Sequence, residues 1–202
     1  RGFGSRANFG IRGIKLIVDG VPETTPDGQS QIDNLNLEII EKIEVIRGVG
    51  SSLYGNSSAG VIKIKTLQQV QNNFVRIGFS LGSNQKNKSQ LFLGQKHKKT
   101  SYTFLYSQTK SNGYRNNSGF KNNNLNATLF KKVNDKTNYG LSFNYVDSPF
   151  AIDPGGLTIE EVETNRKQAR ERNVIYDTKE SIKHLKVSGS FEKKLSNKLT
   201  FS

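Results

Sequence analysis

The sequence has 202 residues, of which 33% are hydrophobic and 23% are charged, and its formal net charge at pH 7 is +13. This length allows one or two domains, but the polarity argues against one large apolar core. Cysteine is absent, which excludes disulfides and thiolate metal sites. The Lys and Arg residues are scattered through polar turns, for example at 96–99. We therefore expect a solvated basic surface and no nucleic-acid partner, with attraction to anionic lipid headgroups or an anionic ligand as the alternative.

The first third of the chain predicts an α+β domain. Residues 14–18 form a short apolar strand, which Asp19-Gly20 ends by turn chemistry. Residues 23–31 are polar and contain proline and glycine, which predicts a loop. A mixed apolar pattern then predicts a short helix around residues 37–41.

Residues 43–66 join two β-branched runs through a turn rich in glycine and serine. Ile43 and Val45 precede this turn and 61–64 follow it, at spacings that favour half-buried strands. The glycines require a sharp turn or a close approach of the backbone. No Gly-Lys-Ser/Thr sequence follows and no strong helix pattern begins there, which argues against a nucleotide-binding loop.

From residue 73 onward, apolar residues alternate with small or polar ones along several runs. Such strands have one apolar face and one polar face, which is typical of a barrel wall between lipid and a wet lumen. No run approaches the ~18 consecutive apolar residues of a membrane helix. Aromatic residues near the ends of the runs suit either an interfacial girdle or cross-strand packing. The alternating runs are 74–81, 102–107, 139–146 and 185–192, and the aromatic residues are Tyr102, Tyr139, Tyr145 and Phe150.

The connections between these runs alternate in length. Short polar turns are predicted at 97–99, 134–136 and 196–197, and long loops at 111–124 and 148–180. Outer-membrane barrels have short turns at one end and long loops at the other. A soluble β-sandwich, the alternative fold, has no reason to sort its loops by length.

The segment 157–172 departs from the strand pattern. Thr158 precedes Glu160-Glu161, and the segment ends in basic residues, so both ends complement a helix dipole. We expect one short surface helix inside an outer loop, with its charges on a solvated face.

Catalytic chemistry has little support in this sequence. His97 and His184 are far apart, and neither has a carboxylate or a second histidine at ligand spacing. Ser51-Ser52 lies outside a Gly-x-Ser-x-Gly motif. We therefore expect neither an enzyme nor a resident metal.

Three ordered motifs in the first third resemble the plug domain of TonB-dependent outer-membrane receptors. They are RGFG at 1–4, IVDGVP at 17–22, and IEVIRG at 43–48 followed by SSLYG at 51–55 and GVI at 60–62. The resemblance implies an α+β plug domain over 1–67, and over 68–202 the first about seven antiparallel strands of a transmembrane β-barrel that has 22 strands in the complete family. The sequence starts inside a motif without an initiator Met, so we expect a piece of a longer receptor that does not function alone.

The resemblance implies a receptor in the bacterial outer membrane that imports a scarce metal chelate, such as a ferric siderophore or ferric citrate. Its partners would be the TonB energy-transducing complex, the chelate and outer-membrane lipid. The metal would be cargo, and the protein itself would need no cofactor. The alternative is a passive porin-like or adhesive barrel protein, which would need no plug.

The resemblance also assigns site residues in the plug. Two apical loops, 4–10 and 23–31, would contact the ligand. Arg6 would offer a fork of donors to anionic oxygens. Arg1 and Arg47 would latch the plug to glutamates of the barrel wall, because a buried arginine charge needs a partner. The expected ligand contacts are Ser5, Arg6, Asn8, Asp27, Gln29 and Gln31.

Overall fold

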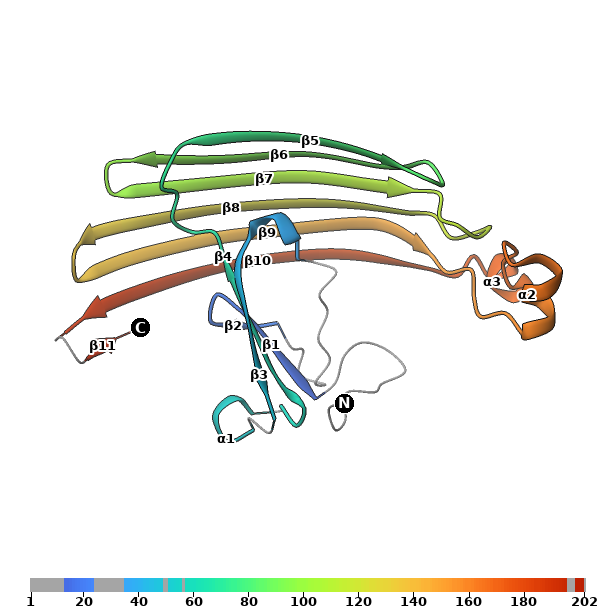
Figure 1. The fold of residues 1–202 in the computed structure, drawn as a ribbon, viewed down its shortest axis with the longest axis horizontal. Helices are drawn as coiled ribbons and strands as arrows, with labels where there is room; N and C mark the ends of the chain where they lie inside the picture. Colours follow the sequence, from blue (N-terminus) through green and yellow to red (C-terminus); the bar gives the residue numbers. More distant parts are fainter. Residues whose placement is uncertain (1–12, 24–34, 49–50, 56, 196–198, 202) are drawn as a thin grey trace. The chain divides into compact units, whose positions relative to one another are not determined.

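The computed structural model describes residues 13–23, 35–48, 51–55, 57–195 and 199–201 (Figure 1). The chain divides into two compact units, Arg1–Leu67 and Gln68–Ser202. Each unit has its own sheet, and each is considered by itself below.

Within the described residues, the first unit contains a four-stranded sheet in the order β2-β1-β4-β3. The two central strands, β1 (Ile14–Val18) and β4 (Gly60–Thr66), are parallel, whereas β2 (Val21–Pro22) and β3 (Ile40–Arg47) pair antiparallel with β1 and β4 respectively. The central pair has a strand on each side, and its apolar residues supply the core. The core consists of Leu16, Val18 and Ile64, with Leu35, Ile40 and Ile62 packed against it. The predicted strand at 14–18 is confirmed.

The helix predicted at 37–41 is shorter than expected. A single 3-10 turn, η1 (Leu37–Ile39), follows Asn36, whose side-chain oxygen accepts a hydrogen bond from the Glu38 backbone N–H at 3.0 Å. Ile40 and Glu41 already belong to β3, because the β-branched residues that follow favour an extended chain. The glycine-rich turn contains a short helix, α1 (Ser51–Tyr54), which the sequence pattern did not predict.

Strand β3 is more exposed than its pattern predicted. Ile43 and Val45 are 53% and 62% exposed. β3 is an edge strand that pairs only with β4 among the described strands, and its side chains are exposed after Ile40, so the half-buried prediction was wrong for β3. A bulge at Glu41 separates the pairs Ile40↔Thr66 and Lys42↔Lys65.

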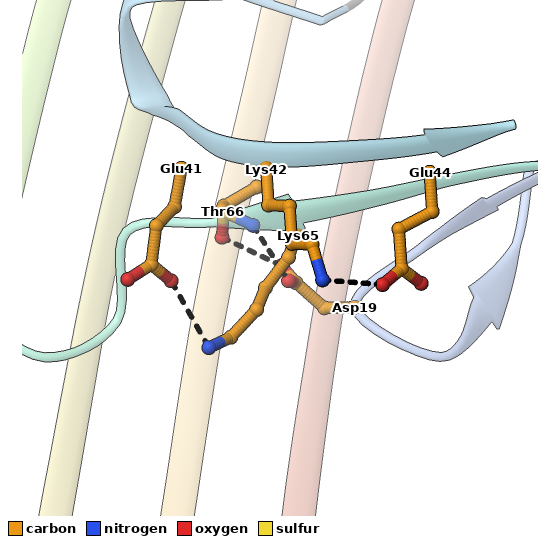
Figure 2. A network of polar contacts seen from close by, with 6 residues as sticks. All are labelled: Asp19, Glu41, Lys42, Glu44, Lys65 and Thr66. Carbon is orange, nitrogen blue, oxygen red and sulfur yellow. Dashed lines mark hydrogen bonds and ion pairs between the residues drawn. The ribbon is translucent and has the colours of Figure 1, made fainter.

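Asp19 joins the end of β1 to the end of β4. It has a left-handed conformation (φ 51°), which aspartate tolerates better than most residues. Its carboxylate accepts hydrogen bonds from the backbone N–H of Thr66 at 2.8 Å and from the Thr66 hydroxyl at 2.6 Å, as Figure 2 shows. The Asp19 N–H in turn donates to the Ile64 carbonyl at 2.9 Å. The turn prediction was therefore correct but incomplete, because this side chain connects residues 47 positions apart.

Surface ion pairs complete the polar network of Figure 2. Lys65 Nζ lies 3.0 Å from Glu41, and Lys42 Nζ lies 2.5 Å from Glu44. The hydrogen bond from Lys42 holds the pKa of Glu44 below its usual range, and the same bond raises the pKa of Lys42. All four side chains are well exposed, so these pairs contribute little to stability.

Within the described residues, the second unit is one antiparallel sheet in the order β11-β10-β9-β8-β7-β6-β5. Each strand pairs with the next in the chain, as Figure 1 shows for the long strands. This confirms the predicted antiparallel wall. The strands are β5 (Phe74–Gly82), β6 (Lys86–His97), β7 (Thr100–Ser111), β8 (Phe120–Asn134), β9 (Thr137–Ile152), β10 (Lys179–Lys194) and β11 (Thr200–Phe201).

The described connections are sorted by length, as predicted. Two-residue turns at 98–99 and 135–136 lie at one end of the sheet, and the connections 83–85, 112–119 and 153–178 lie at the other (Figure 1). The long loops are shorter than predicted because β8 begins at Phe120 and β9 continues to Ile152. The third predicted turn, 196–197, lies outside the described residues.

The predicted helix at 157–172 is two helices, α2 (Ile159–Asn165) and α3 (Glu171–Ile175). Thr158 caps α2 with a capping box: its Oγ1 accepts from the Glu161 N–H, and its own N–H donates to the Glu161 carboxylate. The helix ends after Asn165, whose side chain accepts from the Lys167 N–H and so competes with helix continuation. In the part of the chain that the structure describes, no helix is long and apolar enough to cross a membrane.

Gly94 makes room for an aromatic cluster on β5 and β6. Phe74 lies opposite Gly94, its ring packs edge-to-face on Phe92 with centroids 5.1 Å apart, and the Arg76 guanidinium lies 4.6 Å from the Phe74 centroid. A Cβ at position 94 would overlap the Phe74 ring.

We predict that Asp19→Gly weakens the connection between β1 and β4. Glycine keeps the left-handed backbone but removes both acceptors, so opening at Thr66 becomes easier by about 2 kcal/mol. Amide hydrogen exchange at Thr66 measures this change. Asp19→Asn keeps one acceptor and should lose about half as much. Equal exchange in the parent and in Asp19→Gly would contradict a stabilising role for the carboxylate.

We also predict that Gly94→Ala lowers the stability of the sheet by about 1–3 kcal/mol, because the new methyl group displaces a packed ring. The urea midpoint of the gene product in detergent micelles measures the loss. Gly82→Ala is the matched control, since a Cβ there meets Lys86 at an ordinary 3.5 Å. Adding Phe74→Leu to Gly94→Ala should recover part of the loss, and no recovery would show that the ring is not the cause.

Candidate functional site

Most of the predicted plug contacts lie outside the described residues. This applies to the ligand contacts Ser5, Arg6, Asn8, Asp27, Gln29 and Gln31 and to the latch residue Arg1. Arg47 is described: it ends β3 opposite Gly60, and its side chain is exposed. Gly60 has φ 148°, and a Cβ there would lie 2.6 Å from the Ile46 carbonyl oxygen, so glycine permits this close pairing. The roles assigned to all these residues stay predictions.

One face of the second unit's sheet is apolar across neighbouring strands, and we call it the apolar face. The strand register aligns its side chains in rows that cross from β5 to β10. Several of these side chains are more than 60% exposed: Val75, Ile77, Leu185 and Val187. A large contiguous exposed apolar patch is unusual unless it contacts a membrane or a partner. The two central rows are Ile77, Leu91, Tyr106, Leu125, Tyr145, Leu185 and Val75, Leu93, Phe104, Ala127, Phe143, Val187.

Polar rows border the apolar face at both ends. Toward the longer loops the border row begins with Phe79 on β5 and is polar from β6 to β10, where it consists of Ser89, Gln108, Asn123, Asp147 and Lys183. Toward the short turns the border row includes His97, Thr100 and Lys131. Ser89 and His97 are roughly 27 Å apart along β6 at ~3.4 Å per residue, or about 20 Å along the normal for a tilt of ~40°. This height is close to the apolar band of about 25 Å on outer-membrane barrels.

Aromatic residues mark the short-turn end of the apolar face. Tyr139 pairs with Phe191, and their ring centroids are 5.2 Å apart; Phe201 lies 6.1 Å from Phe191. Tyr139 therefore packs across strands and also lies at the border where a girdle is expected, whereas Tyr145 lies in a central row away from that border. The girdle stays a prediction.

The opposite face of the sheet, which we call the polar face, carries hydroxyl and amide groups. The Thr103 and Thr128 hydroxyls are 2.5 Å apart, and those of Ser142 and Ser188 are 2.6 Å apart. An amide ladder crosses β8 and β9: Asn144 Nδ2 donates to Asn126 Oδ1 at 2.7 Å, and Asn126 Nδ2 donates to Asn124. These groups offer neutral donors and acceptors, and Lys186, the register partner of Asn144, adds a positive charge to the same face.

Gln90 adds an unused acceptor to the polar face. Its Oε1 is buried and has no hydrogen-bond partner in the part of the chain that the structure describes. The asparagines at 122–126 were assigned largely to a loop in the sequence, because asparagine is a poor strand former. Their alternation with Leu125 was the signal that could have revealed β8.

Arg115 connects two of the longer loops. Its guanidinium donates to the backbone oxygens of Gly155 at 2.6 Å, Gln168 at 2.9 Å and Pro154 at 3.1 Å. The neighbouring Asn116 N–H donates to the Lys167 carbonyl at 2.7 Å. The loop 112–119 is therefore docked on the loop 153–178. Sequence reasoning missed this contact because backbone carbonyl partners leave no residue signature.

Hydrogen bonds within the loop 153–178 lie next to the carbonyls that Arg115 contacts. Arg170 N–H donates to the Pro154 carbonyl at 2.7 Å, which closes the loop on itself, and Asn173 Nδ2 donates to the Asp153 carboxylate at 3.0 Å. Ser118 Oγ in turn accepts from the Arg115 N–H at 3.1 Å. Hydrogen bonds within the loop 153–178 thus accompany the contacts of its carbonyls with Arg115.

We predict that Arg115→Ala separates the two loops. Loss of three charge-assisted hydrogen bonds should make amide exchange in 153–178 about 30-fold faster, equivalent to about 2 kcal/mol. Arg115→Lys should be intermediate, because an ammonium cannot reproduce the guanidinium fork. Arg166→Ala is the matched control, since Arg166 is exposed in the same loop. Similar exchange in Arg115→Ala and Arg166→Ala would refute the docking role.

Among the described residues, no group of three or more His, Asp or Glu side chains is arranged to hold a metal ion.

Comparison with known proteins gives matches in both units. Residues 1–62 match the family model described as the TonB-dependent Receptor Plug Domain. The vitamin B12 transporter BtuB of Vibrio vulnificus strain CMCP6 is 26% identical over 169 residues, covering 77% of this chain and 28% of the transporter. BtuB of strain YJ016 is 30% identical over 142 residues, covering 64% of this chain and 22% of the transporter.

Solved structures share the fold at low sequence identity. The unliganded ferric citrate transporter FecA has a TM-score of 0.77 at 22% identity, covering 97% of this chain and 32% of FecA. FpvA of P. aeruginosa, bound to heterologous pyoverdines, has a TM-score of 0.73 at 15% identity, covering 96% of this chain and 28% of FpvA. The chain thus spans less than a third of the length of each relative named here.

Three observations point to the same kind of protein. Residues 1–62 match a plug domain, the connections of the second unit's sheet are sorted by length, and one face of that sheet is apolar. The relatives are transporters and receptors, not enzymes, and their family resides in the bacterial outer membrane. Residues 1–62 therefore match a TonB-dependent receptor plug domain, and the antiparallel strands that follow share the fold of the corresponding part of such receptors.

Proposed function

We propose that this chain is part of a receptor that binds a scarce metal chelate, a ferric siderophore or ferric citrate, and imports it with energy transduced by TonB. One observation carries the proposal: a plug-domain match at residues 1–62 precedes a sheet with the fold of a barrel wall. A plug blocks free diffusion, so passage requires that it move or unfold. Import against a gradient then needs an energy source outside the receptor.

The chemistry of the polar face supports a large, oxygen-rich ligand. Hydroxyls and amides on β7, β8 and β9 form hydrogen bonds without imposing a charge on the ligand. In this proposal Arg6 supplies the cationic contact, and the amides of Gln29 and Gln31 supply neutral ones. The metal enters inside its chelate as cargo, and the protein holds no cofactor of its own.

A passive porin-like or adhesive barrel is the second candidate. Its supporting observation is the apolar face, which any outer-membrane barrel shares. The plug match favours the first candidate, because an open pore has no use for a plug.

Uptake measurements separate the two candidates. The gene product is expressed in cells that lack other receptors, and accumulation of ⁵⁵Fe-citrate, ⁵⁵Fe-siderophores and labelled vitamin B12 is followed with and without TonB. We expect accumulation of an iron chelate that stops when TonB is removed. Uptake that continues without TonB would support the passive barrel. TonB-dependent uptake of vitamin B12 alone would keep the transport class and overturn the iron assignment.

A further inference from the structure

Two lysines lie opposite each other on the apolar face's side of the sheet, just beyond its border. Lys110 on β7 and Lys121 on β8 are register partners, and Lys110 also pairs with Asn87 of β6. Along each strand they continue the alternation of the apolar face, two residues past Gln108 and Asn123. Their side chains therefore extend from the same face as Tyr106 and Leu125, at the end that carries the longer loops.

A bulge places an aromatic residue in the same row. β8 pairs Asn123 with Asp147 but Lys121 with Phe150, and β10 likewise skips a residue of β9 in this interval. Both irregularities span Pro149, which cannot donate a ladder hydrogen bond. The row beyond the border thus consists of Leu81, Asn87, Lys110, Lys121 and Phe150.

The lysine pair has no carboxylate in its own row. Like charges directly opposite on adjacent strands destabilise a sheet unless something neutralises them. Within the described part of the chain, no ion pair involves Lys110 or Lys121. Asp147 lies one row closer to the apolar face, opposite Lys183, and among the described residues no ion pair joins it to Lys110 or Lys121. The two lysines are thus left as a concentrated positive charge.

The depth of this row matches a lipid headgroup. Asn87 is roughly 34 Å from His97 along β6, or about 26 Å along the membrane normal at a tilt of ~40°. This is the height at which the apolar band of about 25 Å gives way to headgroups. Acyl chains on the apolar rows would therefore bring a headgroup phosphate to the level of the lysines.

We propose that Lys110 and Lys121 form a binding site for a phosphate-bearing lipid headgroup in the outer leaflet. Lysine ammonium groups bind phosphate as point charges, and each contributes about 1 kcal/mol to attraction at a membrane surface. A soluble anion would gain only the charge contact, whereas a lipid also covers exposed apolar rows such as Ile77 and Leu185. The site rests on the membrane placement of the family and not on the proposed cargo, so a failed uptake assay leaves it standing.

The test measures lipid binding by the purified gene product. It is presented with phosphatidylcholine nanodiscs that contain, or lack, a diphosphorylated glucosamine disaccharide lipid of the lipid A type. Binding is followed by native mass spectrometry. The parent should bind the phosphorylated lipid, and Lys110→Gln with Lys121→Gln should bind it roughly 30-fold more weakly. Lys110→Arg with Lys121→Arg should restore binding, since the charge returns.

The control removes the same charge from the same face at the opposite end. Lys131→Gln with Lys193→Gln alters exposed lysines on β8 and β10 near the short turns and should leave binding within about twofold of the parent. Unchanged urea midpoints show that both double variants fold. Parental binding by the Lys110/Lys121 variant, or an equal loss in the control, would overturn the proposal. Displacement of the lipid by inorganic phosphate at the same concentration would also overturn it, because the site would then bind a free anion.

Discussion

Cross-strand backbone hydrogen bonding in the second unit is the constraint on which the rest of that unit depends. In a bilayer no water satisfies a free N–H or carbonyl, so the strands must pair without interruption through the apolar rows. The register from His97↔Thr100 to Asn87↔Lys110 is continuous, and so is the pairing of β7 with β8. Because side chains alternate, this register sorts every residue between the two faces, and a slip of one residue would place leucines on the polar face.

The irregular pairings of β8 with β9 lie outside the central rows. One spans Pro149 and the other lies between Lys132 and Asn134 beside a short turn. Both positions are near a border of the apolar face, where water or headgroups can satisfy an unpaired group. Between these borders the polar face collects hydroxyls and amides, including the Asn124, Asn126 and Asn144 ladder. An apolar surface and a polar surface thus follow from one pattern of backbone pairing.

The first unit depends on contacts distant in sequence. β1 and β4 are parallel neighbours, although about forty residues separate them, and parallel pairing needs a long connection. The Asp19 carboxylate secures that pair at its far end through the backbone and hydroxyl of Thr66. At the other end Gly60 allows β4 to approach Ile46 and Arg47. The position of Arg47 at the end of β3 therefore depends on Gly60, its register partner on β4.

The sequence by itself determined the features that rest on local pattern. Alternation predicted the wall and its two faces, Thr158 with Glu161 predicted a helix start, and short polar turns predicted the connections at 98–99 and 135–136. The plug motifs pointed to the plug-domain family whose model matches residues 1–62. Tertiary structure alone decided what depends on partners distant in the chain. Asparagines at 122–126 form a strand because β7 and β9 pair with them on both sides, against their own propensity. Arg115 and Asp19 act through backbone groups, which carry no side-chain signature, so only the folded chain shows what they bind.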